Sequence, residues 1–398
     1  MEWKEVRLGD VCTRVCSGGT PKSTNLSYYG GEIPWLNTKE IDFNRIYSTE
    51  KTITDSGLNN SSAKWIVPNT VTVAMYGATA GKSCIVKVPM TTNQACCNLT
   101  INDEVADYEF VYYSLKNDYT TLASLANGGA QQNLNAQIIK DYVLQMPSLA
   151  DQRRIASILS SLDRKIELNN KINADLEEMA QAIFKNWFVD FEPFKDGKFV
   201  DSELGMIPEG WKVGRLGDIT KNKSAKVKER NDVKVLSPVT TGELVLSEEY
   251  FTKQVFSSSI AKYKIVNKGD FAYNPARVNI GSLGRNEFDF DGCVSPVYVV
   301  FSVLDGYENY FDLFRKTDFF KDSVASLAIG GVRQSLSYDD LSSIEVIIPS
   351  ENAVEEFNNL YNQMKKTIKA NKLESSRLSS LRDTLLPRLM SGELEVPE

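Results

Sequence analysis

The chain opens on WKEVRLGDV at residues 3–11, and nearly the same stretch, WKVGRLGDI, returns at residues 211–219. A second stretch is also repeated, because residues 128–134 read GGAQQNL and residues 330–336 read GGVRQSL. The copies are 208 residues apart in the first case (211 − 3) and 202 in the second (330 − 128). This shared order indicates a duplicated chain. Two similar halves suit a partner with two-fold character, such as duplex DNA or a pair of identical subunits.

Each half then passes a proline, Pro147 or Pro349, into a long helical pattern. Steps of four and three residues between the seam positions are the spacing of a coiled coil. The first seam contains Ile155, Leu159, Leu162, Ile166, Asn169, Asn173, Leu176 and Ile183. The second contains Phe357, Tyr361, Met364, Ile368, Asn371, Leu378 and Leu385, each 202 residues after a member of the first (357 − 155). We interpret the two patterns as one helix, duplicated.

Polar residues interrupt both seams at matching steps, Asn169 and Asn173 in the first and Asn371 and Ser375 in the second. Antiparallel packing of the helices would bring these polar steps to one level and fix the register, with a pseudo-two-fold axis through them. The first helix should run from residue 151 to 188, about 57 Å at 1.5 Å per residue. Pro387 should kink or end the second helix. Alternatively, each helix only covers its own domain.

The regions before the helices are predicted to be mixed α and β, so the expected class is α+β with two similar domains separated by an antiparallel helix pair. Strand-like stretches lie at residues 71–76, 84–88, 270–273 and 296–301, and helical ones at 107–125 and 310–327. The predicted divisions are a first domain at 1–149, a spacer helix at 150–190, a linker at 191–207, a second domain at 208–349, a second spacer helix at 350–390 and a tail at 391–398.

Composition excludes several kinds of chemistry. The chain of 398 residues has no histidine, which rules out histidine-dependent triads, histidine-ligated metals and a histidine base. The six cysteines form no CxxC pair and are typical of reduced thiols, and no apolar run is long enough for a membrane span. A cytoplasmic protein is therefore expected. The net charge of −7 argues mildly against nucleic acid, although residues 212–234 form a locally basic stretch.

Motifs for catalysis are incomplete. The stretch GATAGKS at residues 77–83 resembles a phosphate-binding loop, but only three residues separate its glycines where the motif needs four. It is predicted to be a turn between strands. The stretch NPAR at residues 274–277 lacks the second proline and the aromatic residue of an adenine-methyltransferase motif. Scattered acids such as Asp42 and Asp270 are interpreted as surface residues, so we predict no catalytic residue and no metal site.

DNA contacts are predicted in the polar loops. Phosphate contacts are assigned to Lys22, Lys39, Lys82, Lys223, Lys226 and Arg277. Gln131 and Asn133 in the first half occupy the same repeat positions as Arg333 and Ser335 in the second. Residues that differ between the halves at such positions are suited to base reading. Ser23, Asn37 and Tyr76 complete the set. The same amide side chains could instead cap the next element or hold a turn.

Motifs in both halves, taken in order, resemble the specificity (S) subunit of a type I restriction-modification enzyme. They are residues 3–11, GGTP at 18–21, IPWLN at 33–37, TNQ at 92–94, residues 128–134, PSLADQRRI at 147–155, WFVDFEPF at 187–194, ELGMIPEGW at 203–211 and LLPRLMSGE at 385–393. This resemblance implies two target-recognition domains that read a bipartite, asymmetric site in double-stranded DNA. It also implies two helices that act as a spacer and bind two methyltransferase (M) subunits.

Cofactors implied by the resemblance belong to partners. S-adenosylmethionine is expected on the M subunits, ATP and Mg²⁺ on the restriction (R) subunits, and no cofactor on this chain. Two alternatives remain: an enzyme in its own right, disfavoured by the incomplete motifs, and a two-copy protein-binding scaffold that does not read DNA, which the acidic balance favours slightly.

Overall fold

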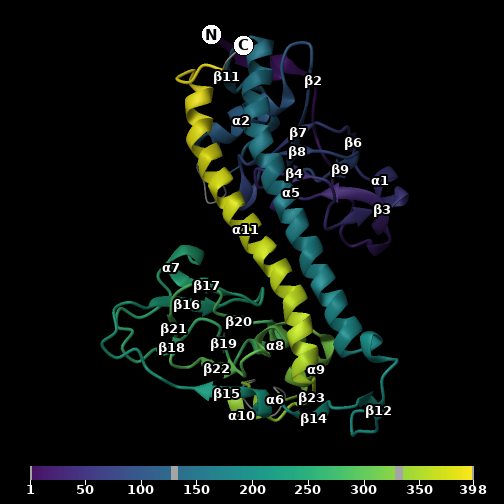
Figure 1. Cartoon of the computed structure of the whole chain (residues 1–398). Coiled ribbons are helices and arrows are strands. Elements are labelled where there is room, and N and C mark those ends of the chain that lie inside the picture. Colours follow the sequence, from purple (N-terminus) through teal and green to yellow (C-terminus); the bar gives the residue numbers. More distant parts are fainter. Residues whose placement is uncertain (1, 127–132, 328–334, 397–398) are drawn as a thin grey trace. The chain divides into compact units, whose positions relative to one another are not determined.

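The computed structural model describes residues 2–126, 133–327 and 335–396. The chain forms two compact units, one of residues 1–170 with 371–398 and the other of residues 171–370. Both long helices contribute to both units. Each unit therefore combines one mixed α/β domain with about half of each helix (Figure 1).

Two sheets and a separate strand pair build the first domain. The sheets have the strand orders β2-β10-β7-β8-β4 and β5-β3-β9-β6, and β1 pairs with β11. The strands are β1 (Lys4–Arg7), β2 (Cys12–Ser17), β3 (Tyr29–Leu36), β4 (Arg45–Ile46), β5 (Thr52–Ile53), β6 (Trp65–Ile66), β7 (Val71–Ala74), β8 (Ser83–Val86), β9 (Met90–Thr92), β10 (Cys96–Ile101) and β11 (Val143–Met146). The short helices are α1 (Asp55–Asn59), α2 (Tyr108–Asn117), α3 (Tyr119–Ser124) and α4 (Ala136–Asp141).

The second domain repeats this topology. Its sheets have the orders β15-β22-β19-β20 and β17-β16-β21-β18, and β14 pairs with β23. The strands are β12 (Phe199–Val200), β13 (Ile207–Pro208), β14 (Lys212–Arg215), β15 (Thr220–Lys223), β16 (Lys234–Pro238), β17 (Leu244–Leu246), β18 (Lys264–Val266), β19 (Phe271–Tyr273), β20 (Leu283–Arg285), β21 (Gly292–Val294), β22 (Val299–Val303) and β23 (Glu345–Ile348). The short helices are α6 (Leu216–Ile219), α7 (Ser247–Tyr250), α8 (Glu308–Phe314), α9 (Asp318–Leu327) and α10 (Tyr338–Ser342).

Strand directions agree between the copies as well as strand orders. The β3–β9 pair is parallel, and so is its counterpart β16–β21. The repeated WKEVRLGDV and WKVGRLGDI stretches occupy the same place, because β1 lies antiparallel to β11 and β14 lies antiparallel to β23. In the described residues the five-stranded sheet of the first domain has one extra strand, β4, beyond its counterpart. The duplication inferred from the sequence therefore extends to the fold.

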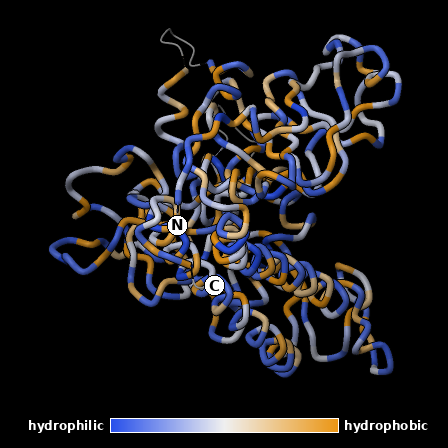
Figure 2. The backbone as a smooth tube through the Cα atoms, turned by 90° about the horizontal axis from the view of Figure 1, so that it is seen from above, coloured by the Kyte–Doolittle hydropathy of each residue, from blue (hydrophilic) through white to orange (hydrophobic). Residues whose placement is uncertain are grey.

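The two long helices, α5 (Leu149–Phe188) and α11 (Glu351–Met390), run antiparallel. In the first unit the start of α5 packs with the end of α11, and Ile155 and Leu159 share a core with Leu386 and Leu389. In the second unit the end of α5 packs with the start of α11, and Phe184 contacts Phe357 with ring centroids 6.2 Å apart. Apolar and hydrophilic residues alternate along both helices (Figure 2). The predicted α+β class with a packed antiparallel helix pair is confirmed.

Four local predictions differ from the structure. The helical stretch 107–125 is divided at Asp118, whose ψ of 11° leaves the helical range between α2 and α3. The stretch 310–327 is likewise divided into α8 and α9. Of the two outcomes predicted for Pro387, an end of the helix is excluded, because α11 continues to Met390. A proline in the last turn removes only one backbone N–H donor, so it can be accommodated there. The predicted strand at 296–301 begins only at Val299, after a turn in which Tyr298 N–H donates to Ser295 O.

Candidate nucleic-acid interface

A turn follows β7 in the first domain, and its counterpart follows β19 in the second. Gly81 N–H donates to Ala74 O at 2.8 Å, and Gly77 and Gly81 both have positive φ angles, of 79° and 85°. This confirms that GATAGKS is a turn between strands. In the second domain Asn274 N–H donates to Ser282 O at 3.1 Å, and Gly281 has a φ of 94°.

The chain that follows the repeated GG stretch is attached to this turn in both domains. Leu134 N–H donates to Met75 O at 2.8 Å, and Leu336 N–H donates to Pro275 O at 3.0 Å. Asn133 also forms a β-bridge with Tyr76. The turn and the described residues that follow the GG stretch are therefore neighbours in each domain.

Exposure is high among the described members of this turn and its attached segment. Tyr76 is 40% exposed, and Asn133, Arg277 and Ser335 are also exposed. Gln131 and Arg333 lie outside the described residues. The described residues form a surface of hydrogen-bonding and aromatic groups held on backbone hydrogen bonds, the kind of surface that can contact bases or phosphates.

The GGTP stretch forms a second loop that is fixed by close backbone packing. A Cβ on Gly18 would lie 2.2 Å from Thr92 O, and one on Gly19 would lie 2.1 Å from Ala63 N, so both positions need glycine. Trp35 Nε1 donates to Gly19 O at 2.9 Å, and the Tyr29 hydroxyl donates to Pro21 O at 2.6 Å.

This anchoring presents Lys22 and Ser23 to solvent at the tip of the loop. Lys22, Lys226 and Arg277 are exposed, and none of the three forms an ion pair within the described residues. These three cations have the properties expected of phosphate contacts.

The other three predicted phosphate contacts have acidic partners in the same domain. Lys82 lies 2.5 Å from Asp42, and Lys39 is paired with Glu50. The Lys39–Glu50 pair is exposed, and in the other pair Asp42 is exposed while Lys82 is partly buried. Ion pairs at such solvent-accessible positions add little stability, so either lysine can exchange its acid for a phosphate. Lys223 differs, because it lies 2.8 Å from Asp270, whose side chain is only 5% exposed.

Asp270 is therefore not the surface residue that was predicted. Burial raises the pKa of Asp270, and the charge of Lys223 opposes that shift. Lys223 compensates a buried carboxylate and belongs to the domain framework. The sequence held no signal for these pairs, because 40 residues separate Asp42 from Lys82 and 47 separate Lys223 from Asp270.

Asn37 also has a local structural role. Its side-chain oxygen accepts from Asn93 Nδ2 at 3.3 Å, and its backbone N–H donates to the Glu40 carboxylate at 2.9 Å. This is the capping function that the amides could have had instead of base reading.

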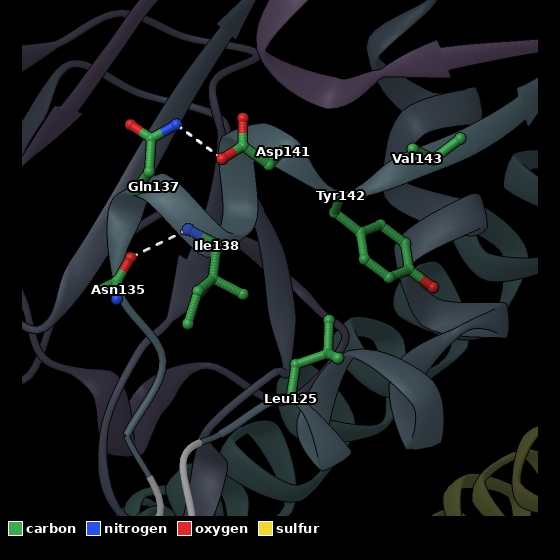
Figure 3. Close-up of a pocket in the computed structure, with 7 residues that line it drawn as sticks. All are labelled: Leu125, Asn135, Gln137, Ile138, Asp141, Tyr142 and Val143. Atoms are coloured by element: carbon green, nitrogen blue, oxygen red, sulfur yellow. Dashed lines mark hydrogen bonds between the residues drawn. The ribbon is translucent and has the colours of Figure 1, made fainter.

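A shallow hollow of about 410 Å³ lies beside α4 of the first domain (Figure 3). It is lined by Leu125, Asn135, Gln137, Ile138, Asp141, Tyr142 and Val143. Its polar groups bond to each other, since Gln137 Nε2 donates to Asp141 at 2.7 Å and the Asn135 side chain accepts from Ile138 N–H at 2.9 Å. The described residues contain no group of three or more potential metal ligands. Within the same residues no helix is both long and apolar enough to cross a bilayer.

Known proteins are similar to this chain in sequence, and a solved structure is similar to it in fold. Residues 1–178 match the model of a type I restriction modification DNA specificity domain. The chain is 29% identical to the type I restriction enzyme MjaIX specificity subunit of Methanocaldococcus jannaschii, over 100% of this chain and 94% of that protein. It is 25% identical to the type I restriction enzyme HindI specificity subunit of Haemophilus influenzae, over 72% of this chain and 77% of that protein. The crystal structure of a type I restriction-modification S subunit from M. genitalium has the same fold, with a TM-score of 0.62 and 18% identity over 100% of this chain and 97% of that one.

Proposed function

We propose that this chain belongs to the specificity-subunit family of type I restriction-modification enzymes, and that it reads a bipartite, asymmetric site in double-stranded DNA. It is the specificity subunit, so the sequence recognition of the complex is its task and catalysis is not. The alternative of an independent methyltransferase or nuclease is therefore set aside.

One observation carries the proposal of two unlike half-sites. Each domain holds an exposed turn and the segment after its GG stretch side by side on matching backbone hydrogen bonds. The framework is repeated, but the side chains on it differ, with Tyr76 in one turn and Arg277 in the other. A repeated framework with unlike contact residues favours reading two different short sequences.

We assign the target-recognition domains to residues 1–149 and 208–349, with a linker at 191–207, a tail at 391–398 and the spacer helices at 150–190 and 350–390. Ser23, Tyr76, Asn133 and Ser335 are proposed base or backbone contacts, and Gln131 and Arg333 stay in that group as predictions. Lys22, Lys226 and Arg277 are proposed as phosphate contacts that need no prior release from an acidic partner. Lys39 and Lys82 would contact phosphate only after leaving their acids.

The helices offer a surface for the M subunits. Met179 on α5 and Leu381 on α11 are 50% and 47% exposed, and they occupy equivalent positions of the duplicated helix (381 − 179 = 202). Exposed apolar side chains at equivalent positions are suited to two copies of one protein. We propose that two M subunits bind there with S-adenosylmethionine, and that R subunits with ATP and Mg²⁺ join this complex in the cytoplasm.

Methylation mapping tests this function directly. The chain is expressed with its M subunit in cells that lack other methyltransferases, and modified adenines are located genome-wide. We expect two unlike half-sites separated by unspecified bases, and exchange of residues 1–149 for those of a relative should change one half-site only. A continuous or perfectly palindromic site would contradict the proposal.

The second candidate is the protein-binding scaffold. It is favoured by the net charge of −7 and by the acids that already pair with Lys39, Lys82 and Lys223. The two functions differ in the effect of salt, because binding to DNA releases counterions and weakens steeply as salt rises. If the assembled complex does not bind DNA even at low salt, the scaffold function is favoured.

A further inference from the structure

A buried arginine joins the first domain to helix α5. Arg45 begins β4, and only 2% of its side chain is exposed. Its guanidinium lies 2.9 Å from Glu167 and 3.9 Å from Asp163 on the helix, and 3.1 Å from Glu109 within the domain. A buried guanidinium needs anions close by to offset its lost hydration. On the first helix, therefore, Asp163 and Glu167 face Arg45 with negative charge, while Arg164 between them lies 3.5 Å from Glu109.

Asp163 is the centre of this contact. It accepts from the Tyr113 hydroxyl of the domain and from Arg382 of α11, both at 2.6 Å. Burial and the charge of Asp163 raise the pKa of Tyr113, which keeps the hydroxyl protonated as a donor. The carboxylate thus bonds to the domain on one side and to the second helix on the other.

The equivalent position of the second helix carries the opposite charge. Lys365 lies 202 residues after Asp163 (365 − 163). Its ammonium group lies 2.6 Å from the Glu287 carboxylate of the second domain. Here the helix supplies the cation and the domain supplies the anion.

The inversion is repeated one turn further along the helix. Lys369 occupies the position of Glu167 (369 − 167 = 202) and lies 2.9 Å from Asp289. Two consecutive domain-facing positions are therefore acidic on α5 and basic on α11. A single chance substitution could reverse the charge at one of these positions, but it would not reverse the charge at both.

The domains show the complementary inversion. Val71 pairs with Ile85 in the first domain and Phe271 with Arg285 in the second, so the two strand pairs are related by 200 residues (271 − 71). On that alignment Glu287 occupies the position of Lys87. The carboxylates of Glu109 and Glu167 act on the Lys87 ammonium group and oppose the lowering of its pKa by burial.

We infer that each recognition domain is matched to its own helix by charge, and that this match disfavours the exchanged arrangement. A first domain seated on the start of α11 would place Arg45 against Lys365 and Lys369. A second domain seated on the start of α5 would place Glu287 and Asp289 against acids. Like charges at close range disfavour such contacts, and an unpaired buried Arg45 adds its own desolvation cost.

The match determines which domain lies on which helix, and so it sets the order of the two half-sites. That consequence for DNA rests on the proposed function, whereas the match itself does not. The residues at issue are positioning residues, because none of them belongs to the proposed DNA-contacting set.

Charge reversal in the full chain tests the match. In K365D/K369E, protease should cleave the second unit about tenfold faster than in the wild-type chain, because two ion pairs become repulsive. Adding E287K/D289K restores opposite charges and should return the rate to within about twofold of wild type. K366D/R377E makes the same change in net charge at exposed positions of α11 and should leave the rate unchanged.

A graft provides the second arm. Residues 1–148 replace residues 209–350, once before native α11 and once before α11 with K365D/K369E. The graft on the reversed helix should resist protease about tenfold better than the graft on native α11. Equal rates for the two grafts, or failure of E287K/D289K to rescue the reversed chain, would overturn the inference. The protease assay contains no DNA, so it separates this outcome from a failure of the proposed DNA reading.

Discussion

Asn169 of α5 donates its side-chain amide to the Glu374 carboxylate of α11 at 2.8 Å, in the first unit. The same amide lies 3.3 Å from the Ser375 hydroxyl, so two of the four polar steps of the duplicated seam contact each other. Asn169 is fully buried, and its side-chain oxygen has no hydrogen-bond partner in the described residues. A buried polar group that is only partly satisfied costs stability, which indicates that its benefit lies in the choice of register.

Replacing Asn169 by leucine should therefore raise stability and loosen specificity. We expect a higher Tm in N169L, because an unsatisfied buried amide is replaced by an apolar side chain of similar size. We also expect sliding of the helices, visible as additional disulfide-trapped registers between cysteines introduced on α5 and α11. L168N, which places an amide at an exposed neighbouring position, is the control and should change neither quantity. A lower Tm together with a single register in N169L would show that the amide is mainly stabilising.

Removal of an unpaired loop cation should weaken DNA binding without changing the sequence that is read. For K22A and R277A in the assembled complex, affinity should fall for every DNA sequence, and the slope of log K against log salt should decrease by about one per substitution. K195A removes a cation that pairs with Glu192 and is the matched control. Unchanged slopes in both variants would mean that the phosphate surface lies elsewhere.

K223A should act on stability instead, because it leaves the carboxylate of Asp270 without its cation. We expect an increase in urea sensitivity, by about 1–3 kcal/mol in the free energy of unfolding. K226A removes an exposed cation from the same region and should leave that free energy within about 0.5 kcal/mol of wild type. Urea unfolding provides the measurement, followed by tryptophan fluorescence in a background where Trp3, Trp35 and Trp65 are replaced by phenylalanine, so that the signal comes from Trp187 and Trp211 of the second unit. Equal stability of K223A and K226A would contradict the framework role of Lys223.

The difference between Lys22 and Lys223 illustrates what the sequence could predict. Periodic patterns depend on neighbours along the chain, so the helices, the duplicated seam and the turn at residues 77–83 could be recognised. Ion pairs such as Lys223–Asp270 depend on which strands become adjacent, and a lysine in a loop reads alike whether it is free or paired. Helix breaks such as that at Asp118 were missed because the apolar period continues across them.

Acid should destabilise the second unit partly through Asp312. Burial disfavours the charge of Asp312, but Arg315 at 2.6 Å and nearby lysines outweigh burial and lower its pKa from 3.8 to about 2. A lowered pKa in the folded state gives stability that is present above pH 4 and is lost as pH falls from about 4 to 2. D312N should lose about 2 kcal/mol at pH 7 and show a smaller pH dependence in that window. D318N, at an exposed acid, should retain the wild-type dependence.

The length of the two helices should set the number of base pairs between the half-sites. If the two helices set the distance between the half-sites, inserting one heptad into each at matched positions, after residues 170 and 372, should keep the seam in register. Seven residues add about 10 Å to a helix, which corresponds to roughly three base pairs. Methylation mapping should then find the same two half-sites with a spacer longer by about three base pairs. An insertion of two residues in each helix rotates the seam by about 200°, away from its partner, and is the control, for which we expect loss of methylation. Unchanged spacing with altered half-sites in the heptad variant would show that the loops, and not the helices, set the distance.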